Sequence, residues 1–171
     1  MLIRPVRAAD LPLLGDIERA AGELFAAIGM PEVAADEPFT IEELERYRAS
    51  GYAWVATDPE PVAYLVAEPI DGNLHIEQVS VRPDHAGQGI GRQLIDTAGA
   101  VDFPALTLTT FRDVPFNAPY YRRLGFRDLP AAEETPGLRR VRRAEAEHGL
   151  DRWPRLCMRR DNPVATTGTL R

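Results

Sequence analysis

The chain has 171 residues, of which 44% are hydrophobic and 27% charged, and its formal net charge is −6. This composition predicts one folded globular domain and excludes a disordered, collagen-like or repetitive chain. The chain has one cysteine, no apolar run of about 20 residues and no signal-peptide core, which indicates a cytoplasmic protein with no membrane partner. The acidic total argues against nucleic acid as the main partner.

All 20 basic residues are arginine, so lysine Schiff bases and a Walker-type phosphate lysine are excluded. The charge is unevenly distributed. Residues 1–80 hold 15 carboxylates and 5 arginines, whereas residues 81–171 hold 11 carboxylates and 15 arginines. This asymmetry predicts an acidic and a basic surface with different partners.

The first half of the chain predicts a strand, two helices and three strands. Residues 1–6 form the first strand. Asp10 is expected to cap a helix that ends near Ile28 and has one apolar face (Leu14, Ile17, Ala21, Leu24, Phe25 and Ile28). Residues 31–39 are expected to be a loop. A Thr40–Glu43 capping box then starts a helix over 40–49, and strands follow at 52–57, 61–68 and 73–81.

The second half predicts alternating helices and strands. The expected helices cover residues 92–101, 117–124 and 135–148, and the expected strands cover 105–111 and 155–160. No segment is rich enough in linker residues to divide the chain. We therefore expect one α/β domain over residues 1–160 and a flexible tail over 161–171.

Three alternating glycines, Gly87, Gly89 and Gly91, lie between a predicted strand and a predicted helix. Glycines allow a tight turn, and the free N–H groups at a helix start favour a phosphate or pyrophosphate. A plain strand-to-helix turn is the alternative. The spacing does not fit the dinucleotide fingerprint, and the missing lysine excludes a P-loop.

Two segments, VSVRPDHAGQGIGRQLI and NAPYYRRLGF, resemble motifs of the GNAT N-acetyltransferase superfamily. The resemblance extends over about residues 1–160 and implies acetyl-CoA as cosubstrate. It also implies a mixed central sheet of six to seven strands with splayed fourth and fifth strands, flanked by about four to five helices. Ala86 departs from the family pattern, which usually has Arg or Gln at this position.

The resemblance also implies roles for individual residues. Tyr121 is the expected proton donor to the leaving thiolate. Glu77 is the expected base, and His75, on the same face of the strand, is the alternative. Asn117 either contacts the cofactor arm or caps a helix. The other residues expected to bind the cofactor are Val79, Val81, Ala86, Gly87, Gln88, Gly89, Ile90, Gly91 and Arg92.

The acceptor is expected to be a primary amine of a small, cationic molecule, because residues 31–45 hold six carboxylates and no basic residue. Phe25, Tyr64 and Phe111 are candidate apolar walls of its pocket, or core residues. One cysteine and three histidines provide no zinc site, so no metal is expected. Direct transfer in a ternary complex is implied. The alternative is a non-catalytic acyl-CoA-binding sensor or scaffold, and a homodimer is left open.

Overall fold

The computed structural model describes residues 1–163, which contain seven strands and six α-helices. They divide into two compact units, one made of residues 1–68 and 76–98, the other of residues 69–75 and the chain from Gly99 onward. The elements are β1 (Leu2–Pro5), α1 (Leu11–Ala26), α2 (Pro31–Ala34), α3 (Ile41–Ser50), β2 (Ala53–Thr57), β3 (Pro61–Ile70), β4 (Asn73–Val81), α4 (Ile90–Gly99), β5 (Ala105–Phe111), α5 (Ala118–Arg123), β6 (Arg127–Leu129), α6 (Pro136–Glu147) and β7 (Arg155–Asp161).

The strands form a mixed sheet of seven strands, as predicted, and their order is β1-β2-β3-β4-β5-β7-β6. β4 and β5 pair in parallel, whereas β1–β2, β2–β3, β5–β7 and β6–β7 pair in antiparallel fashion. The β4–β5 ladder joins Leu74 to Leu106 and His75 to Thr107, at the beginning of both strands. After His75, β4 passes from the second unit into the first.

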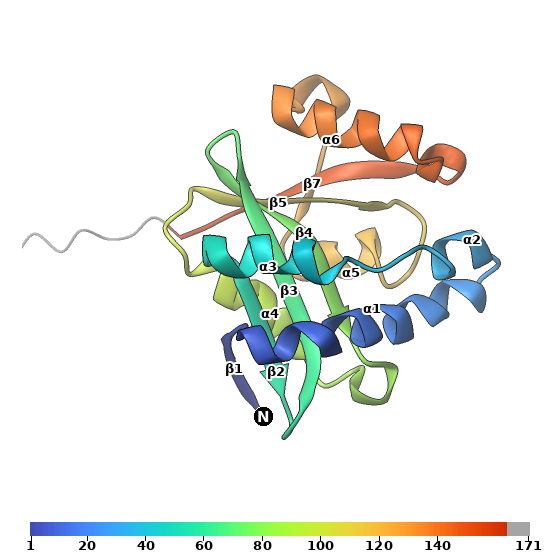
Figure 1. The fold of residues 1–171 in the computed structure, drawn as a ribbon. Coiled ribbons are helices and arrows are strands. Elements are labelled where there is room, and N and C mark those ends of the chain that lie inside the picture. Colours follow the sequence, from blue (N-terminus) through green and yellow to red (C-terminus); the bar gives the residue numbers. More distant parts are fainter. Residues whose placement is uncertain (164–171) are drawn as a thin grey trace, which may run out of the picture. The chain divides into compact units, whose positions relative to one another are not determined.

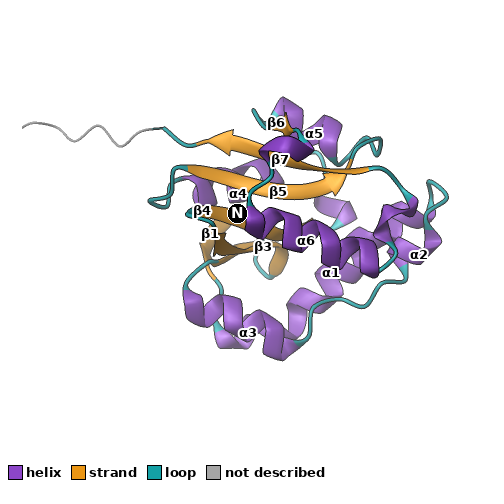
Figure 2. Ribbon diagram, turned by 90° about the horizontal axis from the view of Figure 1, so that it is seen from above, coloured by secondary structure: helices purple, strands orange, loops and turns teal. Residues whose placement is uncertain are grey.

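The core of the first unit lies between β2–β3 and two helices. α1 contributes Leu14 and Ile17, and α3 contributes Leu44, to a buried cluster with Val55 and Val66. Figures 1 and 2 show α1 and α3 on one face of the strands of this unit and α4 on the other. The strands of the first unit, including the part of β4 that leads into the glycine loop, are therefore covered by helices on both faces.

The apolar face predicted for α1 is only partly correct. Leu14 and Ile17 are buried, but Leu24 and Ile28 are 40% and 44% exposed. The core cluster includes no residue of α1 after Ile17, so the last turns of this helix lie outside that cluster. The short helix α2 occupies part of the predicted loop 31–39; it begins with Pro31, a residue that suits the first turn of a helix.

Asp10 precedes α1 as predicted, but its side chain does not cap that helix. The carboxylate accepts bonds of 2.7 and 2.9 Å from the two terminal nitrogens of the Arg4 guanidinium and one of 2.7 Å from the Arg7 N–H. The Arg4 hydrogen bond is the main cause that lowers the pKa of Asp10. A bidentate arginine is a stronger partner for a carboxylate than a single backbone N–H, and it takes the group away from the helix end.

In the second unit, α6 lies on one face of β5 and β7, and α5 lies on the other (Figure 2). Leu138 of α6 packs with Leu129 and Cys157 of the strands. α6 begins as predicted, since Thr135 accepts a bond from the Leu138 N–H. The predicted flexible tail 161–171 starts too early, because Asp161 is the last residue of β7 and the Asn162 side chain donates to the Phe103 carbonyl. Residues 164–171 of this tail lie outside the described residues.

Gly137 in the first turn of α6 has no room for a side chain, which gives a prediction about stability. Its N–H donates to Asp71 Oδ2 at 2.7 Å, and an added Cβ would lie 2.6 Å from the same oxygen and also overlap Ile70. Gly137→Ala is therefore expected to lower the free energy of unfolding by about 1–3 kcal/mol in chemical denaturation. Gly22→Ala in α1 is the control: its Cβ would have no neighbour closer than 3.7 Å, so this variant should be as stable as the parent or more so.

Candidate active site

The glycine loop joins β4 to α4 within the first unit. After Val81 comes a short 3₁₀ turn, Pro83–His85, and residues 86–89 are exposed. Gly87 and Gly89 have φ of +77° and +76°, a conformation that L side chains rarely adopt. α4 begins at Ile90, two residues earlier than predicted, because the Gln93 N–H already bonds to the Gly89 carbonyl at 3.1 Å.

The N–H groups from Gly87 to Arg92 have no hydrogen-bond acceptor among residues 1–163. Ile90 and Gly91 are buried and hold the start of α4 against the core, whereas a Cβ at Gly87 or Gly89 would meet nothing within 4 Å. A fixed helix start whose amides have no acceptor in the described chain, beside an exposed glycine loop, is suited to an anion such as a pyrophosphate. The predicted loop residues 86–92 are thus brought together. The Arg92 side chain is exposed, and its Nε lies 3.8 Å from Asp96 Oδ2.

The predicted residues of β4 follow one another on the strand that leads into this loop. Glu77, Val79 and Val81 are all half-buried. Tyr47 of α3 lies close enough to Glu77 to feel its charge: burial raises the pKa of Tyr47, and the Glu77 and Glu68 carboxylates raise it further. The assignment of Glu77 as base stays a prediction.

His75, the alternative base, is 1% exposed. Its Nδ1 lies 2.8 Å from Thr107 Oγ1, at the end of the β4–β5 ladder. A ring that is buried and held by a neighbouring strand is suited to joining the two strands rather than to accepting a proton from a bound substrate. This observation favours Glu77 over His75.

Tyr121 and Asn117 lie together at α5 of the second unit. The Tyr121 ring makes edge contacts with Tyr120 and Phe126, with ring centroids 5.4 and 5.8 Å apart. Burial raises the pKa of Tyr121, so its hydroxyl remains protonated at neutral pH and is available as a donor. Asn117 precedes α5 but does not cap it; its amide nitrogen donates to the Phe116 carbonyl at 3.0 Å.

The three predicted acceptor-lining residues are not equally accessible. Tyr64 is fully buried, and Phe111 is 5% exposed. Phe111 lies beneath the Arg155 guanidinium at 4.3 Å and against Trp153, so it belongs to the core of the second unit. Phe25, near the end of α1, is half-buried. Of the three, only Phe25 has enough exposed surface to touch a ligand directly.

Glu18 of α1 is a residue of interest that the sequence analysis missed. Its Oε2 accepts a bond of 2.9 Å from the Tyr64 hydroxyl and one of 3.0 Å from the Phe39 N–H. Burial is the main cause that raises the pKa of Glu18, despite these two bonds. The sequence does carry a signal: Glu18 comes four residues after Leu14 and three before Ala21, on the face of α1 predicted to be apolar.

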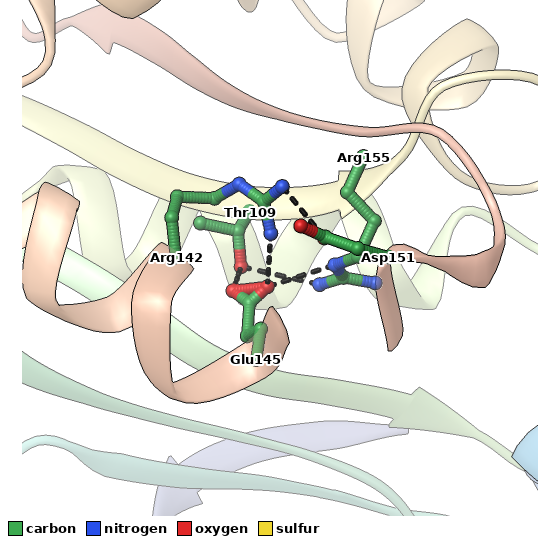
Figure 3. Close-up of polar contacts among 5 residues, drawn as sticks. All are labelled: Thr109, Arg142, Glu145, Asp151 and Arg155. Carbon is green, nitrogen blue, oxygen red and sulfur yellow. Dashed lines mark hydrogen bonds and ion pairs between the residues drawn. The ribbon is translucent and has the colours of Figure 1, made fainter. Parts of the chain in front are cut away.

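A second polar cluster, in the second unit, is fully paired (Figure 3). Glu145 of α6 accepts bonds from Arg155 at 2.8 Å, from Arg142 at 3.2 Å and from Thr109. Arg142 also bonds to Asp151 at 2.8 Å. Two arginines neutralise Glu145, which therefore has a structural role. Cys157 is fully buried, and burial raises its pKa to about 12, which makes it a poor nucleophile.

Comparisons with known proteins agree with this arrangement. Residues 49–128 match the model of an acetyltransferase (GNAT) domain. The fold is similar to the ribosomal-protein-S18-alanine N-acetyltransferase of Escherichia coli (TM-score 0.63, 16% identity, 99% of both chains covered). It is also similar to the PaiA N-acetyltransferase of Thermoplasma acidophilum, solved in complex with coenzyme A (TM-score 0.66, 15% identity, 94% of this chain and 98% of that one). An acetyltransferase from Thermus thermophilus matches with a TM-score of 0.61 and 23% identity, over 94% of this chain and 97% of that one.

These structural likenesses, all below 25% identity, establish the fold, and the family model adds the sequence match. Within residues 1–163, no helix combines the length and the apolar character needed to cross a bilayer. The matched segment 49–128 holds both the glycine loop and Tyr121. This segment therefore matches a GNAT acetyltransferase domain, within a chain whose fold is that of solved N-acetyltransferases.

Proposed function

We propose that the chain transfers the acetyl group of acetyl-CoA to a primary amine of a small, cationic molecule, in one direct step within a ternary complex. The observation that carries the proposal is the run of N–H groups from Gly87 to Arg92, which has no acceptor in the described part of the chain. These amides would hold the pyrophosphate of acetyl-CoA, as the resemblance implies. The coenzyme A complex of the similar PaiA acetyltransferase supports this cosubstrate.

In the proposed step, the amine nitrogen forms a bond to the thioester carbonyl carbon, and the bond from that carbon to sulfur breaks. Glu77 accepts the proton of the attacking amine through a water molecule. A main-chain N–H near Val79 stabilises the charge on the carbonyl oxygen, and Tyr121 gives its proton to the leaving sulfur. Tyr121 is protonated at neutral pH, because burial raises its pKa above that of an ordinary phenol, so the proton is present before the transfer.

The preference for a cationic acceptor is supported by the charges of the first unit. The carboxylates Asp36 and Glu43 lie near enough to Glu18 to raise its pKa, and no ion pair with an arginine is found for Glu18 in residues 1–163. Such a region favours the approach of a positively charged molecule. The single, buried cysteine and the use of acetyl-CoA fit a cytoplasmic location.

The direct test measures the release of free thiol from acetyl-CoA with a panel of amines. We expect amine-dependent thiol release together with formation of the N-acetyl product, and faster turnover with cationic acceptors than with neutral ones. Binding of acetyl-CoA without thiol release for any amine would instead support a non-catalytic acyl-CoA-binding module. A glycine loop that fails to bind acetyl-CoA would contradict both functions.

Glu77→Gln gives a prediction about the pH dependence of this reaction. At neutral pH an alkylamine with a pKa near ~10 is mostly protonated, so removing the base should lower kcat by about a hundredfold. As the pH rises towards the pKa of the amine, the free base becomes available without help, and the deficit should shrink. Initial rates from neutral to alkaline pH measure this.

Glu68→Gln is the matched control, because Glu68 also lies near Tyr47 but is exposed at the end of β3. This variant should keep the rate and the pH profile of the parent. A Glu77→Gln deficit of constant size over the whole pH range would show that Glu77 does not act as a base.

A further inference from the structure

Glu18 has one carboxylate oxygen engaged and one available. Both of its hydrogen bonds, from Phe39 N–H and Tyr64 Oη, end on Oε2. No bond to Oε1 is found within residues 1–163, and the buried side-chain atom without a partner in that range is Asn162 Oδ1. If Glu18 Oε1 were buried, it would also be a buried atom without a partner. It is not one of these atoms, so Oε1 is exposed to solvent.

The surroundings of Glu18 make its charge costly. The side chain is half-buried on the apolar side of α1, and burial raises its pKa. The neighbouring charges on Asp36 and Glu43 are also negative. Glu145 in the second unit is buried to a similar degree but has two arginines as partners. A desolvated carboxylate with negative neighbours and no arginine ion pair among residues 1–163 is stabilised most by a cation supplied from outside the chain.

Contacts through two aromatic residues, Phe39 and Tyr47, lead from Glu18 towards Glu77. Phe39, whose N–H bonds to Glu18, makes an edge contact with Tyr47 at 5.6 Å between ring centroids, and Tyr47 in turn lies near Glu77. All of these residues belong to the first unit, around the buried ring of Tyr64. Aromatic rings near carboxylates favour organic cations such as alkylammonium groups. Two carboxylates of one unit that are linked through these neighbouring rings suit an acceptor that carries two nitrogens.

We infer that Glu18 is the specificity-determining residue for the acceptor, and that its Oε1 binds a positively charged group other than the amine that is acetylated. The substrate class is therefore an alkyl diamine, or a larger amine with a second cationic group. One nitrogen reacts next to Glu77, and the other is held by Glu18. This inference rests on the proposed function and adds to it the feature by which the acceptor is recognised.

The test compares 1,5-diaminopentane with 1-aminopentane, which differ by one charge. For the parent enzyme we expect a higher kcat/KM with the diamine. Glu18→Gln should raise KM for the diamine by about tenfold to a hundredfold, the range for a charge-assisted hydrogen bond, and change kcat by less than about twofold. The same variant should leave KM for the monoamine within about twofold. Glu23→Gln, on an exposed position of the same helix, should change neither acceptor.

A purely structural Glu18 predicts a different pattern. If it served only to hold Phe39 and Tyr64, Glu18→Gln would affect both acceptors equally, or neither, and either outcome overturns the inference. Stability gives a second readout. The folded-state pKa of Glu18 is raised above its unfolded value, so its contribution to stability is present at low pH and is lost as the pH rises through the folded pKa. Glutamine retains the accepting oxygen without the charge, so the variant should be at least as stable as the parent at neutral pH.

Failure of the proposed function is distinguishable from failure of this inference. If the parent releases no thiol with any amine, the proposed catalytic function is wrong. The role of Glu18 is then tested by diamine binding, measured as a shift in Tm. In that case 1,5-diaminopentane should raise the Tm of the parent and of Glu23→Gln, but not that of Glu18→Gln. Equal Tm shifts in all three proteins, or none in the parent, would overturn the assignment of Glu18.

Discussion

Tyr121→Phe is expected to lower kcat by about a hundredfold to a thousandfold and to leave the Kd for acetyl-CoA unchanged. The substitution removes only the hydroxyl, and the ring keeps its contacts with Tyr120 and Phe126. Burial raises the pKa of this phenol, so the parent enzyme holds the proton at neutral pH until the leaving thiolate develops. Loss of a positioned proton donor has an effect of this size on the rate. Thiol release under saturating substrates measures kcat, and calorimetry measures Kd.

Tyr120→Phe is the matched control for Tyr121→Phe. Tyr120 is the preceding residue of α5 and makes an edge contact with Tyr121, with the Arg123 guanidinium 5.8 Å from its ring. Tyr120→Phe also removes one hydroxyl group from α5. It should retain a kcat within about threefold of that of the parent. A kcat within twofold of the parent for Tyr121→Phe would remove the role of proton donor from Tyr121. Equal losses in both variants would point to the packing of α5 instead.

The parts of the fold that could be predicted from the sequence are those encoded locally. The Thr40–Glu43 capping box gave the start of α3, since both of its hydrogen bonds join residues three apart. Alternation of side chains gave β4 with its observed bounds, and the glycines gave the loop that follows it. In each case, the residues that decide the structure lie within one turn or one strand of each other.

The parts that could not be predicted depend on residues far apart in the chain. Glu18 and Tyr64 are 46 positions apart, so neither periodicity nor spacing indicates that they bond. Asp10 was expected to cap a helix, but Arg4 on a neighbouring strand binds it more strongly. The exposure of Leu24 depends on where the core cluster ends along α1, which the helix pattern itself does not contain. The acceptor side of the site depends on such contacts, whereas the cofactor loop does not.

Gly89→Val is expected to weaken acetyl-CoA binding by about tenfold to a hundredfold. Gly89 has φ of +76°, and a non-glycine residue there costs roughly 1–2 kcal/mol, more for a β-branched side chain. A Cβ at this position would meet no protein atom within 4 Å, so a clash of the Cβ with the fold is not the cause of the loss. Instead, the backbone relaxes away from positive φ and turns the amides before α4 out of alignment, and the valine methyl groups occupy the space above them. Calorimetric titration with acetyl-CoA measures the loss.

Gly51→Val separates the loss of binding from the strain itself. Gly51 ends α3 with φ of +86°, and a Cβ there also meets nothing within 4 Å, so the two valines cost similar amounts of folding free energy. Both variants should therefore show a similar fall in Tm, but only Gly89→Val should lose affinity for acetyl-CoA. If the two proteins bind acetyl-CoA equally well, the amides from Gly87 to Arg92 do not hold its pyrophosphate. The proposed function then loses the observation that carries it, because no other group of free main-chain donors was assigned to that phosphate.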